Sequence, residues 1–400
     1  MENHTKRILV WTMIVLTVAG LAATGRRVDS SEAQRVAMTF LDGQQRPSVD
    51  SMSASSQDGD LRPLYDTNHE VVVGYVMELE PRGYVVVSID TELEPVIAYS
   101  RDSDFDWEQG PSNVLLDILR TDLTLRLQAL TEGAISSTRR AENERAWSPS
   151  SIAPSSGRMI GPLIESSTWA QGEPWSALLP IDPSTGNRSM TGCGATALAQ
   201  IVNYWDYPTS ITFSGSDSYV TQTRYISVDA TEADIPQISY PAKSHHNPTD
   251  HTMAQLSFAA GVSIKMDYTS NGSGALAMDI AVALAGGRAP AADSKRAHPG
   301  IWGYESADIR TFVNTFWGDP YVQSATAFFD ALQTDMEEGR PAILMIKTQG
   351  SSIGHILICD GYDPESGRYH LNLGWGGHSD GWYALPEDLP AGYNWWNTGS

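Results

Sequence analysis

A cysteine held between two glycines is the residue of this sequence best suited to act as a nucleophile. Cys193 stands in Thr191-Gly192-Cys193-Gly194-Ala195, directly before an apolar stretch with helical spacing. At a helix N-terminus the dipole and the free backbone N–H groups favour the thiolate, which is the reactive form of cysteine. The flanking glycines permit an unusual turn and a close approach of substrate. The alternative is a tight turn that carries a buried, inert thiol.

A histidine downstream could serve as the base that such a nucleophile requires. His355 begins the apolar run Ile356-Leu357-Ile358-Cys359, after a segment from Gly350 to Gly354. A strand behind the histidine would fix its ring while the ring reaches across a cleft. Cys359 lies inside the apolar run, so we expect it to be a core residue and not the nucleophile.

Two polar residues complete a possible catalytic set. Asn372, in Asn372-Leu373-Gly374-Trp375-Gly376-Gly377, could accept a hydrogen bond from the His355 ring while Trp375 shields that bond; a nearby backbone carbonyl could orient the ring instead. Gln171 lies upstream and could stabilise an oxyanion together with the Cys193 N–H. Each residue alone could serve only packing, but the order Gln, Cys, His, Asn is the chain order of papain-like chemistry.

Composition and charge exclude several classes of function. The chain has 400 residues, two cysteines and a net charge of −22, which argues against affinity for nucleic acids or anionic membranes. Two cysteines cannot form a disulfide scaffold. The histidines at 245, 246 and 251 lack the spacing of a zinc site, and Asp102, Asp104 and Asp106 lack the rest of a calcium loop. We therefore predict no metal and no other cofactor.

The N-terminus has the pattern of a secretory signal. Lys6-Arg7 precedes a mostly apolar run from Ile8 to Ala23. We interpret residues 1–27 as a signal peptide and predict a secreted protein, either extracellular or in the periplasm or on the outer surface of a bacterium, with no membrane segment in its mature form. An uncleaved membrane anchor is the alternative.

The first half of the chain has the pattern of a small α+β domain, residues 28–135. The spacing predicts a helix over residues 30–40, strands over 71–76, 83–89 and 95–99, and a long helix from Pro111 to Leu130. The polar, Ser- and Arg-rich stretch that follows, residues 136–160, is typical of an exposed linker.

After residue 160 tryptophan and glycine become frequent, which indicates a second and larger domain over residues 161–400. We expect helices over residues 195–204, 309–316 and 325–338 and buried strands over 342–346 and 356–359. The predicted fold class is α+β in both domains.

These motifs resemble the streptopain family of papain-like cysteine peptidases over nearly the whole chain. The resemblance rests on Pro162-Leu163-Ile164, Trp169 to Trp175, Thr191 to Ile201, Met266-Asp267-Tyr268, Gly272 to Ala275, Gly354-His355 and Asn372 to Gly377. In the first half, Gly83 to Ser88 and Pro95 to Ser100 resemble the family's inhibitory propeptide. Leu373 departs from the family pattern, where an aromatic residue is usual.

The resemblance implies a papain-like cysteine peptidase domain preceded by a small inhibitory prodomain. It implies a zymogen in which the propeptide disturbs the catalytic histidine until proteolysis between Ser136 and Gly161 removes it, with Arg139-Arg140 as one possible target. Cys193 and His355 would be the dyad, with Gln171 and Asn372 as further catalytic residues and Trp375, Gly192 and Gly194 supporting them. The expected partners are protein or peptide substrates and the chain's own propeptide.

Two other functions are compatible with these residues. One is an extracellular amidase or acyl transferase that uses the same dyad on another acyl group, which cleavage of a peptide library would distinguish. The other is an extracellular binding protein that has lost activity, although the four candidate catalytic residues are all present. Labelling by a thiol-directed peptide would distinguish it, because a binding protein has no need of an activated thiolate.

Overall fold

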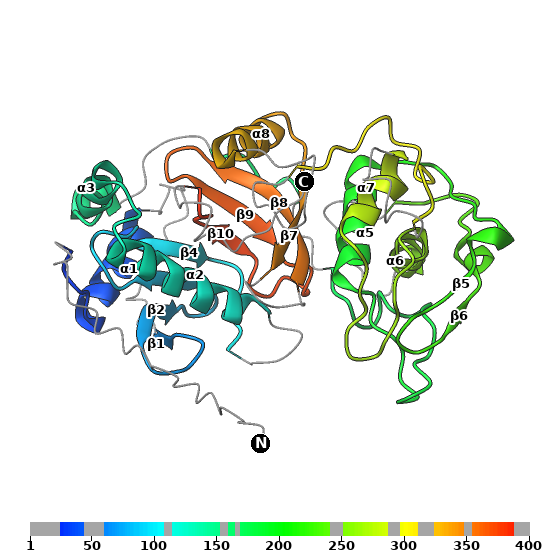
Figure 1. Ribbon diagram of the computed structural model, residues 1–400, viewed down its shortest axis with the longest axis horizontal. Helices are drawn as coiled ribbons and strands as arrows, with labels where there is room; N and C mark the ends of the chain where they lie inside the picture. The colour runs from blue at the N-terminus through cyan, green and yellow to red at the C-terminus, as the bar shows by residue number, and fades with distance from the viewer. Residues whose placement is uncertain are drawn as a thin grey trace, which may run out of the picture.

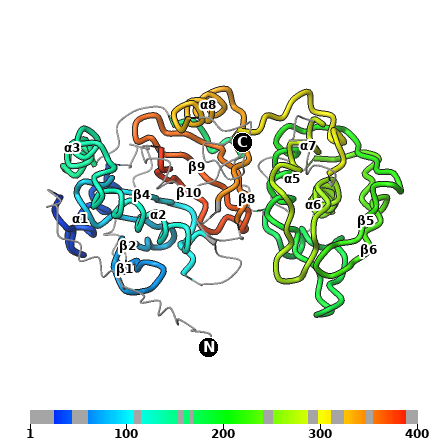
Figure 2. The backbone as a smooth tube through the Cα atoms, in the orientation of Figure 1, coloured from blue at the N-terminus to red at the C-terminus, as the bar shows by residue number. Residues whose placement is uncertain are grey.

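The computed structural model forms two lobes side by side, one built on a large sheet and one built mainly of helices (Figure 1). It describes residues 25–43, 60–107, 114–152, 159–164, 169–240, 251–286, 297–310, 324–347 and 354–387. The tube view shows that the N-terminal part of the chain, in blue, and the C-terminal part, in red, share the sheet lobe (Figure 2). The middle of the chain forms the helical lobe.

One antiparallel sheet joins the two halves of the chain. Its eight strands have the order β1-β2-β3-β4-β10-β9-β8-β7. At the junction β4 pairs with β10, with Tyr99 opposite Trp382 and Ala98 opposite Tyr383. The strands are β1 (Leu61–Tyr65), β2 (Val72–Glu78), β3 (Tyr84–Ser88), β4 (Val96–Ser100), β7 (Ala342–Lys347), β8 (Gly354–Asp363), β9 (Arg368–Asn372) and β10 (Gly381–Tyr383). The N-terminal region therefore extends the sheet of the C-terminal region.

Helices cover both faces of this sheet. One face packs against α2 (Val114–Thr131) and α8 (Ala325–Glu337), and the other packs against α1 (Ser30–Gly43) and α5 (Cys193–Trp205). Within β8, Leu357 and Cys359 belong to the core under α2 and α8, whereas Ile356 and Ile358 belong to the core of the helical lobe. In a strand buried on both faces, successive side chains all point into a core, so apolar and polar residues do not alternate. The sequence of β8 is therefore a continuous apolar run.

The helical lobe surrounds α5. That helix packs against α6 and β8, so almost every residue from Gly194 to Val202 is buried. The other elements are α6 (His251–Ser263), α7 (Met278–Ala285), the short pair β5 (Tyr219–Val220) and β6 (Ser227–Val228), and the 3-10 turns η1 (Gly215–Asp217) and η2 (Ala230–Ala233). This burial makes α5 a rigid support for the residue at its N-terminus.

Most elements predicted from the sequence are present. The predicted helices at 30–40, 111–130, 195–204 and 325–338 correspond to α1, α2, α5 and α8, and all five predicted strands are found. We did not predict β1, β10, α6 or α7 from the sequence, and His251 is the first residue of α6. The helix expected over residues 309–316 lies mostly outside the described residues.

The first part of the expected exposed linker contains two helices, and most of its residues are exposed. Residues 136–152 form α3 (Ser137–Ala146) and α4 (Pro149–Ile152), which pack beside the N-terminal domain. Arg139 forms a 2.6 Å ion pair with Glu94, and Arg140 pairs with Glu92 at 3.4 Å. Charge pairing holds this part of the segment against the N-terminal domain despite its polar composition. The rest of the expected linker, residues 153–158, lies outside the described residues.

In the described ranges, no helix is both long and apolar enough to cross a bilayer. The same residues contain no group of three histidine, cysteine or acidic side chains placed to hold a metal ion. The predicted signal peptide falls almost entirely on residues 1–24, outside the described part of the chain.

Candidate active site

Cys193 is the first residue of α5, and the glycine before it is required by space. Gly192 has φ +84°, a conformation that costs other residues energy. A Cβ on Gly192 would lie 2.8 Å from Met266 Sδ and 2.9 Å from the Ser273 carbonyl oxygen. The turn that presents Cys193 is therefore packed directly against the loop that follows α6.

Gly194 lets the start of α5 approach β8. A Cβ at this position would lie 3.2 Å from Ile356 Cδ1, which is closer than most contacts of this kind. Cys193 is half-buried as a residue, and its thiol lies near enough to the backbone of Ile356 for that backbone to favour the thiolate. Because Ile356 directly follows His355, the candidate nucleophile and the candidate base are adjacent through the first residues of β8.

The electrostatics of Cys193 favour the neutral thiol in this structure. Burial raises the pKa of Cys193 above its usual value, and backbone hydrogen bonds at Ile356, Gly194 and Cys193 itself act in the opposite direction. Burial is the largest of these effects, so it outweighs the helix N-terminus. A thiolate at this position therefore requires a positive partner that the present arrangement does not supply.

His355 is buried, and its ring contacts the turn that follows β9. The residue is 3% exposed, and its Nε2 lies 2.8 Å from the carbonyl oxygen of Leu373. Its ring stacks on Trp375 with centroids 4.6 Å apart and 32° between the planes. Leu373 and Trp375 belong to the core under α2 and α8, whereas Cys193 packs in the core of the helical lobe. No hydrogen bond joins the Cys193 thiol to the His355 ring in the described part of the chain.

The environment of His355 favours a neutral ring with its proton on Nε2. Burial lowers the pKa of His355 to about 4, and the hydrogen bond with the Leu373 carbonyl opposes this effect only in part. A carbonyl oxygen can only accept, so Nε2 must carry the hydrogen, and Nδ1 keeps the lone pair that a base requires. Cys193 and His355 are thus both neutral over a wide pH range around neutrality.

The depressed pKa of His355 predicts a loss of stability at acidic pH. The folded-state pKa of about 4 lies below 6.5, the ordinary pKa of a histidine. The unfolded chain therefore takes up a proton first as the pH falls, and the fold loses roughly 2–3 kcal/mol between about pH 7 and pH 4.5. We expect Cys193→Ala to show this loss relative to the double variant Cys193→Ala/His355→Gln in urea unfolding. An equal pH dependence of the two proteins would contradict the burial of a neutral histidine.

The Asn372 side chain binds Gln200 and the backbone of Gly374. Its amide nitrogen donates to Gln200 Oε1 at 3.3 Å, and its Oδ1 accepts the N–H of Gly374 at 3.0 Å. The Gly374 N–H and the Leu373 carbonyl belong to one peptide group, and that carbonyl is the one bound to His355. Of the two alternatives that the sequence left open, the structure shows the backbone carbonyl at the His355 ring. Asn372 binds the N–H of the same peptide group.

Trp375 and Gln171 lie on segments that connect the two candidate catalytic residues. Trp375 covers the His355 ring, as expected from the sequence. The carbonyl of Gln171 accepts the N–H of Thr191 at 2.8 Å, which holds Gln171 beside the turn before Cys193. Two residues earlier, the carbonyl of Trp169 accepts the N–H of Gly376 at 3.0 Å. The Trp169–Gln171 segment thus connects the Cys193 turn to the turn after β9.

The turn between β9 and β10 is held by the N-terminal domain. Ser103 Oγ donates to the carbonyl of Gly377 at 2.5 Å, and the Ser379 N–H donates to the carbonyl of Asp104 at 3.2 Å. The Tyr84 hydroxyl donates to the carbonyl of Ser379 at 3.0 Å. These contacts come from three residues that sequence reasoning did not connect with the site, because only long-range strand pairing brings them there.

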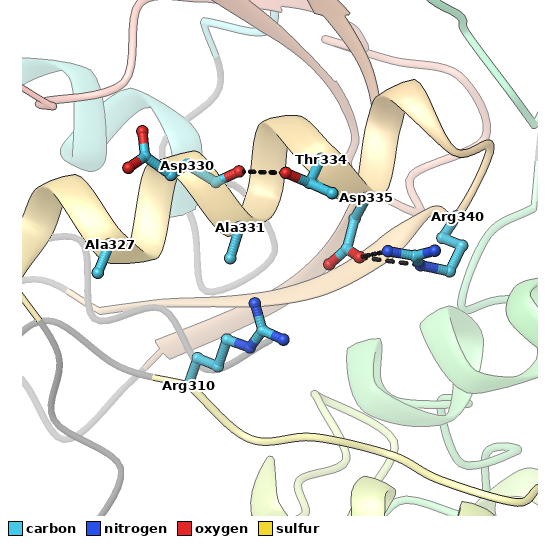
Figure 3. A pocket seen from close by; sticks show the side chains of 7 residues that line it. All are labelled: Arg310, Ala327, Asp330, Ala331, Thr334, Asp335 and Arg340. Carbon is cyan, nitrogen blue, oxygen red and sulfur yellow. Dashed lines mark hydrogen bonds and ion pairs between the residues drawn. The ribbon is translucent and has the colours of Figure 1, made fainter.

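A separate pocket lies along α8 and has a different chemistry. Figure 3 shows its lining, in which the carboxylate of Asp335 pairs with Arg340 at 2.6 Å and the hydroxyl of Thr334 donates to the carbonyl of Asp330 at 2.8 Å. Its remaining lining residues are Arg310, Ala327 and Ala331. This set contains neither candidate catalytic residue, so the pocket is distinct from the site around Cys193.

The fold and the site together define a papain-like cysteine peptidase with an N-terminal inhibitor-type domain. Residues 169–383 match the Peptidase C10 family, and residues 25–122 match the Spi protease inhibitor. The first match covers more than half of the chain, so this chain belongs to the peptidase C10 family. The predicted family and fold class are confirmed.

Individual relatives agree with this assignment. The chain is 25% identical over 394 residues to the thiol protease/hemagglutinin PrtT of Porphyromonas gingivalis, covering 95% of this chain but 41% of that protein. It is 25% identical over 337 residues to streptopain of Streptococcus pyogenes serotype M1, covering 79% of this chain and 75% of that protein. The structure of a prointerpain A fragment from Prevotella intermedia has the same fold, with a TM-score of 0.58, 20% identity, and coverage of 85% of this chain and 97% of that one.

Proposed function

We propose that this chain is the latent precursor of a secreted cysteine endopeptidase that uses Cys193 and His355 as a catalytic dyad. The observation that carries the proposal is the position of the Cys193 thiol. It lies at the N-terminus of a buried helix, close to the backbone of Ile356, the residue after His355. In the proposed active form the His355 ring moves to the sulfur together with the Leu373 backbone to which it is bound.

The proposed reaction is acyl transfer from the peptide to the thiol. His355 Nδ1 takes the thiol proton, and the thiolate attacks the peptide carbonyl carbon to form a C–S bond. Gln171 and the Cys193 N–H stabilise the oxyanion. The imidazolium returns the proton to the leaving amine as the C–N bond breaks, and a water deprotonated by His355 then releases the carboxylic acid from the thioester.

The N-terminal domain is the proposed inhibitor. In its presence no hydrogen bond joins Cys193 to His355 among the described residues, and burial favours the neutral form of both side chains. The contacts of Tyr84, Ser103 and Asp104 with the turn after β9 support this role, because that turn carries the groups around His355. Residues 28–135 would act as the propeptide and 161–400 as the peptidase, after cleavage within 136–160.

Within this segment, the pairing of Arg139 and Arg140 makes that basic pair a poor target for a protease. Residues closer to Gly161 are the better candidates. The preference for an apolar residue one position before the scissile residue, which the family resemblance implies, belongs to the same proposal. Equal cleavage of peptides with charged residues at that position would contradict it.

The names of the relatives support protein substrates, since one is a thiol protease/hemagglutinin and another is streptopain. Secretion rests on the Lys6-Arg7 and apolar pattern of the N-terminus. An amidase or acyl transferase remains the alternative for the same dyad.

Incubation of the purified precursor with a reductant and a protein substrate tests the proposal. We expect the chain to shorten to about the C-terminal domain and to gain proteolytic activity together, with the new N-terminus between residues 136 and 161. A trace of a second protease should start the process if self-cleavage is slow. Absence of substrate cleavage after the prodomain has been removed would contradict the peptidase assignment.

A further inference from the structure

The carboxylate of Asp380 closes the turn that carries the groups around His355. Asp380 immediately precedes β10, and its Oδ1 accepts the N–H of Leu373 at 2.7 Å. The carbonyl of that same Leu373 is the group bound to His355 Nε2. The N–H and the C=O of a single residue, Leu373, therefore bind Asp380 and His355, respectively.

This turn depends on side chains for its shape, because its glycines cannot define it. Gly374, Gly376 and Gly377 all have positive φ values, of 68°, 73° and 87°. Glycine populates many conformations at little cost, so a turn rich in glycine is soft unless other groups fix it. Two side chains do so at its start: Asn372 binds the N–H of Gly374, and Asp380 binds the N–H of Leu373.

Of these two bonds, only the one with Asp380 can be charge-assisted. Hydrogen bonds to an ionised carboxylate are shorter and about twice as strong as neutral ones, and the Asp380 bond is the shorter of the two. The prodomain also holds this turn, through Tyr84, Ser103 and Asp104. Once the prodomain has left, Asp380 and Asn372 hold the start of the turn without those contacts.

We propose that Asp380 is a positioning residue for the catalytic base, acting through the backbone of Leu373 on the ring of His355. The inference rests on the proposed role of His355 as the base. Asp380 touches neither the substrate nor the sulfur. Its carboxylate fixes the Leu373 backbone, and the Leu373 carbonyl selects the tautomer and orientation of the ring.

The charges around Asp380 make this bond dependent on pH. Burial raises the pKa of Asp380 to about 7, with the Leu373 N–H and His370 as the main opposing groups. His370 forms an ion pair with Asp360 at 2.6 Å. The other titratable groups that face Asp380 are Asp102 after β4, Tyr84 on β3 and Tyr383 on β10. Protonation of Asp380 weakens the bond to Leu373, so hydrolysis loses this support as the pH falls through the pKa of the carboxyl group.

The test compares Asp380→Asn and Asp380→Glu with Asp363→Asn in the processed enzyme. Asp363 is a matched control, because it is buried in the same sheet and its carboxylate also closes a turn, accepting from Glu365 N–H at 3.1 Å. We expect Asp380→Asn to lower kcat about 10- to 100-fold, with KM changed less than about two-fold, because a displaced base slows chemistry more than binding. In Asp380→Asn the acidic limb of the plot of kcat against pH should shift. In Asp380→Glu the plot should still show an acidic limb, because a carboxyl group is still present to titrate.

Rates are normalised to folded active sites by titration with an irreversible thiol-directed peptide, so loss of protein is not counted as loss of kcat. Unchanged kcat in both Asp380 variants, or an equal fall of kcat in Asp363→Asn, would overturn the inference. The proposed function is tested separately by His355→Gln. If that variant keeps full activity, the assigned base is wrong; if it is inactive while Asp380→Asn is fully active, only the role of Asp380 fails.

Discussion

Replacing Cys193 by alanine is expected to abolish hydrolysis of peptides and the maturation of the precursor. Without the thiol no acyl-enzyme can form, and removal of a nucleophile costs on the order of 10⁴-fold or more in kcat. The expected result is a precursor that keeps its full length with reductant and cleaves no substrate. Size on a gel and release of a peptide chromophore measure the two effects.

Cys359→Ala is the matched control for this experiment, because the chain has only these two cysteines. Cys359 is fully buried in the sheet core, with its sulfur 3.9 Å from Met336 Sδ. Its removal leaves a small cavity, so it should cost stability, about 1–2 kcal/mol, and little activity. Full activity in Cys193→Ala together with loss of activity in Cys359→Ala would reverse the assignment of the two thiols.

The sequence predicted best those elements whose signal is local. The helix after Cys193 and the strand after His355 are long apolar runs with clear ends, and both are found as α5 and β8. In contrast, β1 was missed because Pro63 interrupts its pattern. Proline removes a backbone donor, but β1 is the edge strand of the sheet, where that loss is tolerated.

The sequence could not predict the sheet that joins the two domains. Each half of it has the pattern of a separate small sheet, and only three residues of β10 carry the junction with β4. Pairing between strands far apart in the chain leaves no periodic signal. The same limitation explains why residues 136–152 were taken as an exposed linker, since their partners Glu92 and Glu94 lie on the other side of α2 in the sequence.

The candidate site was predictable as a set of residues but not as a geometry. Spacing and residue type identified Cys193, His355, Asn372 and Trp375. The hydrogen bonds that connect them run through backbone groups, at Leu373, Gly374 and Ile356, and a backbone group has no sequence signature. Asp380 was missed for the same reason, because an Asp-Gly pair before a strand is first of all a turn signal.

Removal of the prodomain is expected to increase the reactivity of Cys193 sharply. In the precursor, burial raises the pKa of Cys193 and lowers that of His355 to about 4, so no charge pair forms near neutral pH. Once the turn after β9 is released from Tyr84, Ser103 and Asp104, the ring can reach the sulfur. A cysteine paired with a protonated histidine is a thiolate far below its usual pKa, which should raise alkylation about 100-fold or more at mildly acidic pH.

The measurement is the rate of alkylation by iodoacetamide as a function of pH, before and after removal of the prodomain, in Cys359→Ala so that a single thiol reports. His355→Gln in the same background is the matched control, cleaved by an external protease, and it should not show the acceleration. Because the imidazolium is the partner that stabilises the thiolate, the curve of the processed enzyme should extend to lower pH than that of the precursor. Identical curves before and after processing would mean that the prodomain blocks access to substrate without changing the dyad, and the latency of the enzyme would then be steric.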